Sequence, residues 1–354
     1  MKQRTALIMA GGTGGHIFPG LAVAHALRER GWKVHWLGAP ASMEARLVPP
    51  QGFALETIDF SGVRGKGLKT LALAPLRLLR ACGQALAVVR RVQPDVVVGL
   101  GGYISLPGGL MARLAGKPLV LHEQNSVPGM ANKLLARVTD QVFTAFPGVF
   151  AQGHWVGNPL RAPFLQQAAP QERFAGRSGP LRLLVVGGSL GAKVLNDVVP
   201  QALALLPPGL RPLVTHQSGA AQIDALRQNY AAAGVEATLT PFIDDTAQAF
   251  ADADVIVCRA GASTVTEIAA IGAAAIFVPF PAAVDDHQTA NARFLVDAGA
   301  GWLLPQPELS AQMLAKMLQT LERPTLLQRA IKAKEMQKTE ATLMVVSACE
   351  ALIA

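Results

Sequence analysis

The amino-acid sequence predicts an α/β protein with two Rossmann-like, doubly wound domains. Short runs of valine, isoleucine and leucine alternate with helical stretches, which is typical of a parallel sheet covered on both faces. Glycine-rich turns follow several of these runs, and the alternation starts afresh near residue 181. The chain has 354 residues, of which 51% are hydrophobic, so it can form two large cores. We expect one domain over 1–160 and another over 161–338, with a ligand cleft between the carboxyl edges of their sheets.

In the first half of the chain, four apolar runs are expected to form strands. The run 7–10 enters the turn Gly11-Gly12-Thr13-Gly14-Gly15-His16 and a helix that extends to about residue 31. The next run is 34–37. The other two are 95–99, which leads into Gly101-Gly102-Tyr103, and 119–121, which leads into His122-Glu123-Gln124-Asn125.

In the second half, a new strand is expected at 181–186, after a polar, proline-containing stretch. This strand enters the turn Gly187-Gly188-Ser189-Leu190-Gly191, and further strands are expected at 254–258 and 275–279. Helical stretches from residue 310 onward cap the second domain. The last of them, 339–354, is expected to pack back on the first domain.

The charge of the chain is unevenly distributed. Residues 1–160 hold 17 Lys and Arg against 7 Asp and Glu, a net charge of +10, whereas the whole chain has +8. The first half is therefore expected to meet an anionic partner. The sequence has no nucleic-acid-binding motif, so we do not expect that partner to be DNA or RNA.

The sequence argues against several classes of protein. We expect no signal peptide, because the apolar run after Arg4 already ends at Gly11, and no membrane span, because no stretch of about 18 apolar residues is present. The three cysteines, Cys82, Cys258 and Cys349, are scattered and are expected to be reduced thiols.

The stretch 64–91 is expected to contain a helix that starts near Pro75. One face would hold Leu71, Leu78, Leu79, Cys82, Leu86 and Val89. The opposite face would hold Arg77, Arg80 and Arg91, with Lys66 and Lys69 upstream and with Leu73 and Leu76 among the charges. A basic face with exposed leucines indicates binding to a membrane surface. The alternative is an ordinary solvated helix face.

The first glycine turn has the features of a phosphate site. Its glycines let the backbone approach a ligand, and the N-terminus of the following helix supplies N–H groups and partial positive charge. The turn is neither a Walker A loop nor a dinucleotide fingerprint, because Gly-Lys-Ser/Thr is absent and Ile17 stands where the third glycine belongs. Paired glycines recur at 101–102 and 187–188, which favours phosphate ligands in both domains.

Two polar groups stand out in the first domain. His16 lies at a helix N-terminus, which favours the neutral imidazole and a role as base or ligand, although it could instead cap the turn. The group 122–125 follows a buried strand and is expected to line a site, with Asn125 as a ligand. Glu123 could instead form an internal ion pair with Arg137 or Lys133.

Two further groups stand out in the second domain. In the stretch 261–267, loop N–H groups could bind phosphate and Glu267 could bind ribose, but Thr264 and Glu267 also have the spacing of a capping box. In 285–291, Asp285, Asp286 and His287 lack a partner cluster for a metal. Hydrogen bonds from Gln288 and Asn291 to sugar hydroxyls fit better.

Together with Gly157-Asn158-Pro159 and Asp286-His287-Gln288, these motifs occur in the order found in one family. The chain resembles the MurG family of peptidoglycan N-acetylglucosaminyltransferases over nearly its whole length. The pairing of Gly-Gly-Thr-Gly-Gly-His with His-Glu-Gln-Asn is the most specific part of the resemblance.

The resemblance implies a GT-B fold and a hexosyltransferase. GlcNAc would pass from UDP-GlcNAc to the 4-hydroxyl of MurNAc in lipid I, with inversion, to give lipid II for the cell wall, and hence for cell shape and division. It also implies a peripheral protein on the anionic cytoplasmic face of the bacterial inner membrane, with no cofactor and no metal. The alternatives are another GT-B enzyme that glycosylates a membrane lipid, and a nucleotide-sugar epimerase.

The resemblance also assigns site residues. His16 would be the base, with Glu123 as an alternative source or relay of the proton. The acceptor diphosphate would lie at Gly14, Gly15, Gly101, Gly102 and Tyr103. Ile243 would meet uracil through its backbone and Glu267 the ribose, while Arg161 and helix N-termini would balance the charge of the leaving diphosphate. The expected UDP-GlcNAc contacts are Thr13, Gly14, Gly15, Asn125, Arg161, Ser189, Ile243, Ala262, Ser263, Thr264, Val265, Thr266, Glu267, Gln288 and Asn291.

Overall fold

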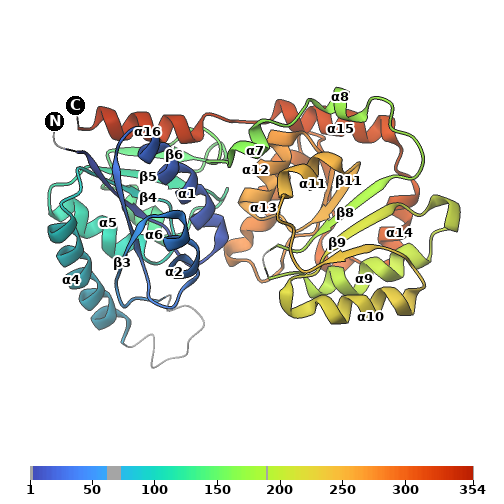
Figure 1. Cartoon of the computed structure of the whole chain (residues 1–354), viewed down its shortest axis with the longest axis horizontal. Helices are drawn as coiled ribbons and strands as arrows, with labels where there is room; N and C mark the ends of the chain where they lie inside the picture. Colours follow the sequence, from blue (N-terminus) through green and yellow to red (C-terminus); the bar gives the residue numbers. More distant parts are fainter. Residues whose placement is uncertain (1–2, 62–72, 189, 354) are drawn as a thin grey trace. The chain divides into compact units, whose positions relative to one another are not determined.

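The computed structural model describes residues 3–61, 73–188 and 190–353 of the chain. They form two compact units, shown in Figure 1. Unit 1 comprises Met1–Arg161 and Lys338–Ala354, and unit 2 comprises Ala162–Gln337. Each unit is built around its own parallel sheet, so the predicted α/β class with two separate sheets is confirmed.

Within the described residues, the sheet of unit 1 has seven parallel strands in the order β3-β2-β1-β4-β5-β6-β7. In chain order the strands are β1 (Thr5–Met9), β2 (Lys33–Gly38), β3 (Ala54–Thr57), β4 (Val96–Gly99), β5 (Leu119–Glu123), β6 (Gln141–Thr144) and β7 (His154–Trp155). The strand order reverses between β1 and β4. In doubly wound sheets, ligands bind beyond the carboxyl ends of the strands at such a point.

Helices cover both faces of the unit 1 sheet. One face carries α1 (Gly14–Glu29), α2 (Met43–Leu47) and α16 (Ala341–Ala351), and the other carries α4 (Ala74–Val92), α5 (Ser105–Leu114) and α6 (Met130–Leu135). Residues of β1 alternate between the two cores, with Ala6 and Ile8 in the first and Leu7 and Met9 in the second. Both faces are thus buried, which explains the uninterrupted apolar runs in the sequence.

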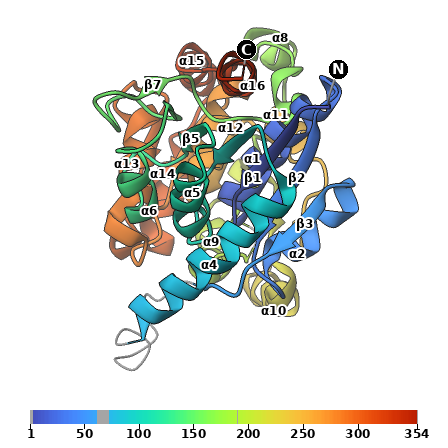
Figure 2. The ribbon, with the colours of Figure 1, turned by 90° about the vertical axis from the view of Figure 1, so that its left-hand side faces the viewer.

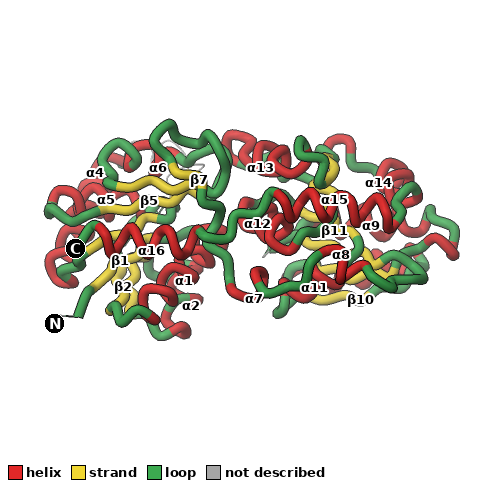
Figure 3. Tube along the Cα trace, turned by 90° about the horizontal axis from the view of Figure 1, so that it is seen from above, coloured by secondary structure: helices red, strands yellow, loops and turns green. Residues whose placement is uncertain are grey.

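Helix α16, at the end of the chain, packs beside α1 in unit 1, as Figures 1 and 3 show. Val345 and Val346 are fully buried there, and Arg30 forms an ion pair of 2.6 Å with Glu350. The last helix therefore completes the core of the first unit.

The core face predicted for α4 is wrong in the first turns of this helix. Ala81, Ala85 and Val89 are buried, but Leu79, which the sequence placed on the core face, is 69% exposed. Figure 2 shows why: α4 lies beside α5, and its start extends away from the sheet. Leu76 and Leu79 are therefore exposed, whereas Leu78 is half-buried.

In the described part of unit 2, six parallel strands have the order β10-β9-β8-β11-β12-β13. The strands are β8 (Arg182–Val186), β9 (Leu213–Gln217), β10 (Thr238–Thr240), β11 (Val255–Cys258), β12 (Ala275–Phe277) and β13 (Gly301–Leu303). The helices are α7 (Ala162–Leu165), α8 (Pro170–Phe174), α9 (Lys193–Ala204), α10 (Ile223–Ala233), α11 (Thr246–Asp252), α12 (Ala262–Ile271), α13 (His287–Val296), α14 (Ala311–Gln319) and α15 (Arg323–Glu335). The strand order reverses between β8 and β11, which marks the expected ligand edge of this unit.

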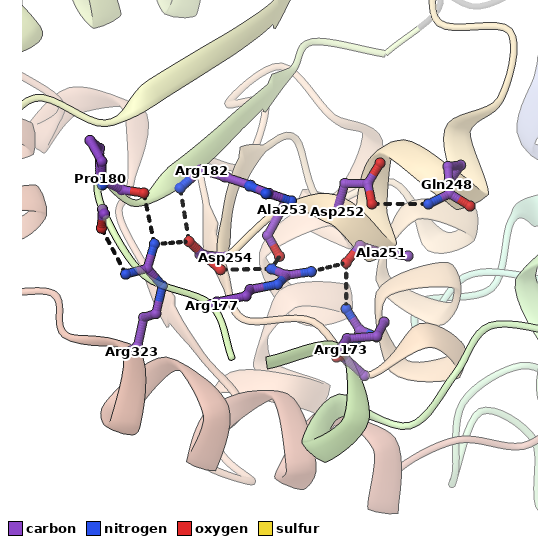
Figure 4. A network of polar contacts seen from close by, with 12 residues as sticks. Arg173, Arg177, Pro180, Arg182, Gln248, Ala251, Asp252, Ala253, Asp254 and Arg323 are labelled. Atoms are coloured by element: carbon purple, nitrogen blue, oxygen red, sulfur yellow. Dashed lines mark hydrogen bonds and ion pairs between the residues drawn. The ribbon is translucent and has the colours of Figure 1, made fainter. Parts of the chain in front are cut away.

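A buried aspartate ties the start of unit 2 to its body (Figure 4). Asp254, directly before β11, accepts hydrogen bonds from Arg177 at 2.6 Å, from Arg323 at 3.1 Å and from the backbone N–H of Arg182 at 2.9 Å. Arg173 and Arg177 also donate to the carbonyl of Ala251 near the C-terminus of α11, where cations are favoured. The carboxylate thereby holds three segments of the chain together.

None of the described helices is both long enough and apolar enough to span a bilayer.

Candidate functional site

The first glycine turn of unit 1 leads directly into helix α1. Thr13 is the N-cap residue, its backbone is extended, and its side chain makes no capping hydrogen bond. The first amides of a helix have no acceptor within the helix, so those of Gly14 and Gly15 can donate to a bound anion. Gly14 and Gly15 are therefore the residues of this turn whose amides could meet the phosphate that we expect from the sequence.

A buried carboxylate holds this turn from inside unit 1. Glu44, in α2, is fully buried and accepts hydrogen bonds from the backbone N–H of Gly12 at 3.2 Å and of Ala39 at 3.1 Å. The amide of Gly12 is thus engaged by the protein itself. Sequence reasoning missed Glu44, because a lone glutamate in a short helix gives no signal that it is buried.

The second glycine pair packs tightly on the first. A Cβ added to Gly102 would lie 2.2 Å from the carbonyl oxygen of Gly11, and one added to Gly12 would lie 3.3 Å from the ring of Tyr103. Gly102 also has φ of +83°, a conformation that favours glycine. The turns after β1 and β4 therefore form one structure at the point where the strand order reverses.

His16 is half-buried in the first turn of α1 and faces Gln124. Its Nδ1 lies 2.7 Å from Oε1 of Gln124. A Cβ added to Gly101 would lie 2.9 Å from the ring of His16, so this glycine leaves room for the imidazole. Gln124 belongs to the polar group that the sequence singled out, but it received no role there.

His122 is fully buried on β5 behind Gln124. Its Nε2 lies 2.8 Å from the carbonyl oxygen of Gly157, and its Nδ1 lies 3.0 Å from Nε2 of Gln124. Burial lowers the pKa of His122 to about 4, although the hydrogen bond to Gly157 opposes this effect. The ring is therefore neutral at physiological pH.

Glu123 is buried and organises the loop that follows β5. Its Oε1 accepts hydrogen bonds from the backbone N–H of Asn125 at 2.9 Å and from its side chain at 3.4 Å. Its Oε2 accepts from the backbone N–H of Gly129 at 3.2 Å and from Asn132 at 2.9 Å. These donors are amides, whereas the sequence allowed an ion pair with Lys133 or Arg137.

Arg161 ends the first segment of unit 1 and is exposed. Its guanidinium lies 5.4 Å from the ring centre of Phe18, a residue of α1. The stacking orients the cation close to the helix whose N-terminus carries the first glycine turn.

In unit 2, the turns after β8 and β9 interlock. A Cβ added to Gly191 would lie 1.8 Å from the carbonyl oxygen of Ser218. Gln217 is buried and donates to the carbonyls of Gly188 at 3.1 Å and of Pro241 at 3.2 Å, so it joins the glycine turn to the loop that contains Ile243. Ser189, an expected donor contact, lies outside the described residues.

Helix α12 begins at Ala262, whereas a capping box of Thr264 and Glu267 would require Thr264 to be the N-cap residue. Its N-cap is Gly261, no side chain caps it, and Thr264 already lies inside the first turn. The capping-box interpretation of Thr264 and Glu267 is therefore wrong. The helix has a free N-terminal turn comparable to that of α1. Within the described residues, the buried hydroxyl oxygen of Ser263 has no hydrogen-bond partner.

Gln288 and Asn291, both in α13, contact the loop that precedes α12. Oε1 of Gln288 accepts from the backbone N–H of Ala260 at 3.2 Å and of Phe280 at 3.0 Å. Asn291 is fully buried and donates to the carbonyl of Ala260 at 3.2 Å. Among the described residues, no group of three or more His, Cys, Asp or Glu is placed to hold a metal ion.

The basic face at the start of α4 is partly described. Leu73 and Leu76 are 48% and 66% exposed, and Arg77 and Arg80 are exposed beside them. Arg80 lies 3.5 Å from Asp59 in a solvent-exposed pair. Lys66 and Lys69 lie outside the described residues.

Comparisons with known proteins agree over the whole chain. The model of the glycosyltransferase family 28 N-terminal domain matches residues 6–144, and that of the C-terminal domain matches 182–345. A relative from Paracidovorax citrulli is 77% identical over 351 residues, 99% of each chain. It is named UDP-N-acetylglucosamine--N-acetylmuramyl-(pentapeptide) pyrophosphoryl-undecaprenol N-acetylglucosamine transferase.

Solved structures give the same result. The crystal structure of Acinetobacter baumannii MurG is 42% identical with a TM-score of 0.86, and the match covers 98% of this chain and 99% of that one. The calicheamicin glycosyltransferase CalG4 is 16% identical with a TM-score of 0.70, covers 100% of this chain and 99% of its own, and shows a likeness of fold alone. The two units are thus Rossmann-like domains of the GT-B fold, and the chain belongs to glycosyltransferase family 28.

Proposed function

We propose that this chain transfers GlcNAc from UDP-GlcNAc to the 4-hydroxyl of MurNAc in lipid I, with inversion, to form lipid II. One observation carries the proposal. A relative that is 77% identical over 99% of both chains is named for this donor and for an N-acetylmuramyl-(pentapeptide) pyrophosphoryl-undecaprenol acceptor. The product is a precursor of peptidoglycan, so the reaction serves cell-wall synthesis.

We assign UDP-GlcNAc chiefly to unit 2. The uncapped N-terminal turn of α12, Ala262 to Thr264, supplies amides for the diphosphate, and Glu267 on the next turn takes the ribose. Because Oε1 of Gln288 is engaged by backbone amides, its NH2 group is the part that meets the sugar. Asn291 is fully buried against Ala260, so we now assign it to the support of this loop rather than to sugar contact.

We assign the diphosphate of the lipid I acceptor to unit 1. The amides of Gly14 and Gly15 bind its phosphate oxygens, while Gly101, Gly102 and Tyr103 shape the turn beside them. Thr13, Asn125 and Arg161 are further contacts to the donor. Amides and one guanidinium can bind a diphosphate through hydrogen bonds and the partial charge at a helix N-terminus.

The proposed base is His16. Its Nδ1 is held by Gln124, and among the described residues its Nε2 has no hydrogen-bond partner, so Nε2 can accept the proton of the acceptor hydroxyl. Glu123 is less suited to this step, since both of its oxygens accept hydrogen bonds from amides. We assign Glu123 to the positioning of the loop that holds Asn125.

We further propose that the start of α4 binds an anionic membrane surface. Leu73, Leu76 and Leu79 are 48%, 66% and 69% exposed, and Arg77 and Arg80 lie among them. Leucines can enter the headgroup region while arginines contact lipid phosphates. This arrangement brings an enzyme to an acceptor that is fixed in the bilayer by its polyisoprenyl chain.

The reaction is tested with radiolabelled UDP-GlcNAc and a lipid I analogue. We expect one labelled disaccharide-lipid for each UDP released. Release of UDP without labelled lipid, or no release at all, would contradict the proposal. His16→Gln should lower kcat by at least about 100-fold and leave the Kd of UDP-GlcNAc nearly unchanged. His25→Gln, on the same helix, is the matched control and should retain activity.

Membrane binding is tested by sedimentation with vesicles that contain anionic lipid. The double variant Arg77→Glu with Arg80→Glu should bind more weakly than the wild type. A control with the same change of charge, Lys193→Glu with Arg227→Glu, alters exposed cations of unit 2 and should bind normally. Equal binding of the two double variants would argue against the α4 surface.

A further inference from the structure

We propose that Gln124 is a positioning residue that fixes the proton of His16 on Nδ1 and so presents the lone pair of Nε2 to the acceptor hydroxyl. This inference rests on the proposed function, in which His16 is the base. It is carried by a continuous series of hydrogen bonds from the carbonyl of Gly157 through His122 and Gln124 to His16.

The series begins at a group that can only accept. The carbonyl oxygen of Gly157 lies 2.8 Å from Nε2 of His122, so this nitrogen carries a hydrogen and donates it. His122 is fully buried and neutral. A neutral imidazole has one N–H only, and Nδ1 of His122 is therefore an acceptor.

The orientation of the Gln124 amide follows from this. Its Nε2 lies 3.0 Å from Nδ1 of His122 and 3.1 Å from the backbone carbonyl oxygen of His122. Both of these atoms are acceptors, so they select the NH2 end of the amide. The reverse orientation would place an oxygen against two acceptors in a site where Gln124 is only 1% exposed.

The oxygen of Gln124 therefore faces His16. Since this oxygen can only accept, Nδ1 of His16 must be the donor across the distance of 2.7 Å. In neutral His16 the second nitrogen, Nε2, then holds a lone pair. Gly101, with φ of +98°, leaves room for the ring, because a Cβ there would lie 2.9 Å from it. The base is thus fixed in both position and tautomer.

The proton transfer can be written in full. The acceptor O–H gives its proton to Nε2 of His16, and the oxygen forms a bond to the anomeric carbon of GlcNAc. The bond from that carbon to the phosphate oxygen breaks, and its electron pair leaves with UDP. His16 becomes an imidazolium with N–H groups at both positions, so the bond to Gln124 persists throughout, and the proton passes later to water.

The state of His16 can be measured directly by NMR. Protein labelled with ¹⁵N-histidine is recorded at neutral pH, and the signals of His16 are assigned from their loss in His16→Asn. We expect the Nδ1–H tautomer in the wild type. In Gln124→Met, which retains length but has no acceptor oxygen, the Nε2–H form should appear. Gln152→Met, which also removes a side-chain hydrogen bond to a backbone carbonyl of unit 1, is the control and should leave the His16 tautomer unchanged.

Kinetics provide a second readout. Gln124→Met should lower kcat by at least about 10-fold with little change in the KM of UDP-GlcNAc, because only the base is affected. Gln124→Glu retains an acceptor oxygen but adds a negative charge, which favours the imidazolium. In the pH profile of kcat, the acidic limb of Gln124→Glu should therefore lie about one pH unit higher than that of the wild type.

The outcomes separate the two proposals. If the wild type transfers no GlcNAc to lipid I, the proposed function fails, yet the NMR experiment still decides whether Gln124 sets the tautomer of His16. A wild-type His16 in the Nε2–H form would overturn the inference. So would an unchanged tautomer in Gln124→Met that has lost activity, because Gln124 would then have only a structural role.

Discussion

The backbone N–H of Gly12 donates a hydrogen bond of 3.2 Å to a buried carboxylate oxygen of Glu44. The other oxygen of Glu44 accepts from the backbone N–H of Ala39. The first glycine turn is therefore held from inside the protein, and its outer amides, those of Gly14 and Gly15, remain for a ligand. The support comes from α2, a short helix that no motif identifies.

Glu44→Gln should destabilise unit 1 by about 1–3 kcal/mol, because an amide offers one acceptor oxygen where two N–H groups require one each. Urea unfolding measures this loss. Glu29→Gln makes the same change of charge at an exposed position of α1 and should have almost no effect. Equal effects of the two substitutions would mean that charge, and not the two hydrogen bonds, matters at Glu44.

Gly102→Ala should cost more stability than Gly116→Ala, although both residues have positive φ. At Gly116 nothing lies within 4 Å of an added Cβ, so only backbone strain of about 1 kcal/mol is expected. At Gly102 the Cβ would meet the carbonyl oxygen of Gly11 at 2.2 Å, and the two turns must separate. Thermal unfolding and the KM of the lipid acceptor should both show the difference. Similar losses in the two variants would contradict tight packing of these turns.

Asp254→Asn should destabilise unit 2 by about 3–5 kcal/mol, because it removes the charge that faces Arg177 and Arg323 in a buried network. The control is Asp224→Asn, which breaks an exposed pair with Arg227 and should cost less than about 1 kcal/mol. Denaturant unfolding of both variants provides the comparison. A loss at Asp254 no larger than that at Asp224 would contradict a stabilising role for this network.

Acid should destabilise the protein between pH 6.5 and pH 5. Burial lowers the pKa of His122 to about 4 and of His216 to about 3, below the unfolded value near 6.5. As pH falls through 6.5, the unfolded chain binds protons that the folded chain does not, so the free energy of unfolding decreases. Each histidine contributes about 2 kcal/mol to this decrease by pH 5. His216→Gln should therefore show a shallower pH dependence of its urea midpoint than the wild type, and an equal dependence would contradict this origin.

The sequence predicted β1, β2, β4 and β5 of unit 1 and β8, β11 and β12 of unit 2, because parallel strands that are buried on both faces must be apolar throughout, as Val96 to Val98 are. The other described strands, such as β3 and β10, are more polar and more exposed and were not predicted. The sequence also placed the glycine turns at one edge of each sheet. The prediction that Leu79 lies on the core face was wrong, since helical periodicity says which residues share a face but not where the helix extends beyond its neighbours. The sequence could not resolve Thr264 either, because the spacing of a capping box does not reveal that the helix starts at Gly261.

The roles of single polar residues were the hardest to predict. Glu44 and Gln124 are buried, and each is defined by partners far away in the sequence, the turn of Gly12 and the ring of His16. Such long-range hydrogen bonds have no local pattern. His16 could be identified because it follows a glycine turn at a helix N-terminus, whereas the residue that orients it could not.

The chemical structure of the reaction product tests the central proposal most directly. The protein is incubated with UDP-GlcNAc, whose sugar is α-linked, and with a lipid I analogue, and the lipid product is analysed by NMR. We predict a single new β-linkage from the anomeric carbon of GlcNAc to O4 of MurNAc. An α-linkage, attachment at another oxygen, or a lipid that carries no GlcNAc would contradict it.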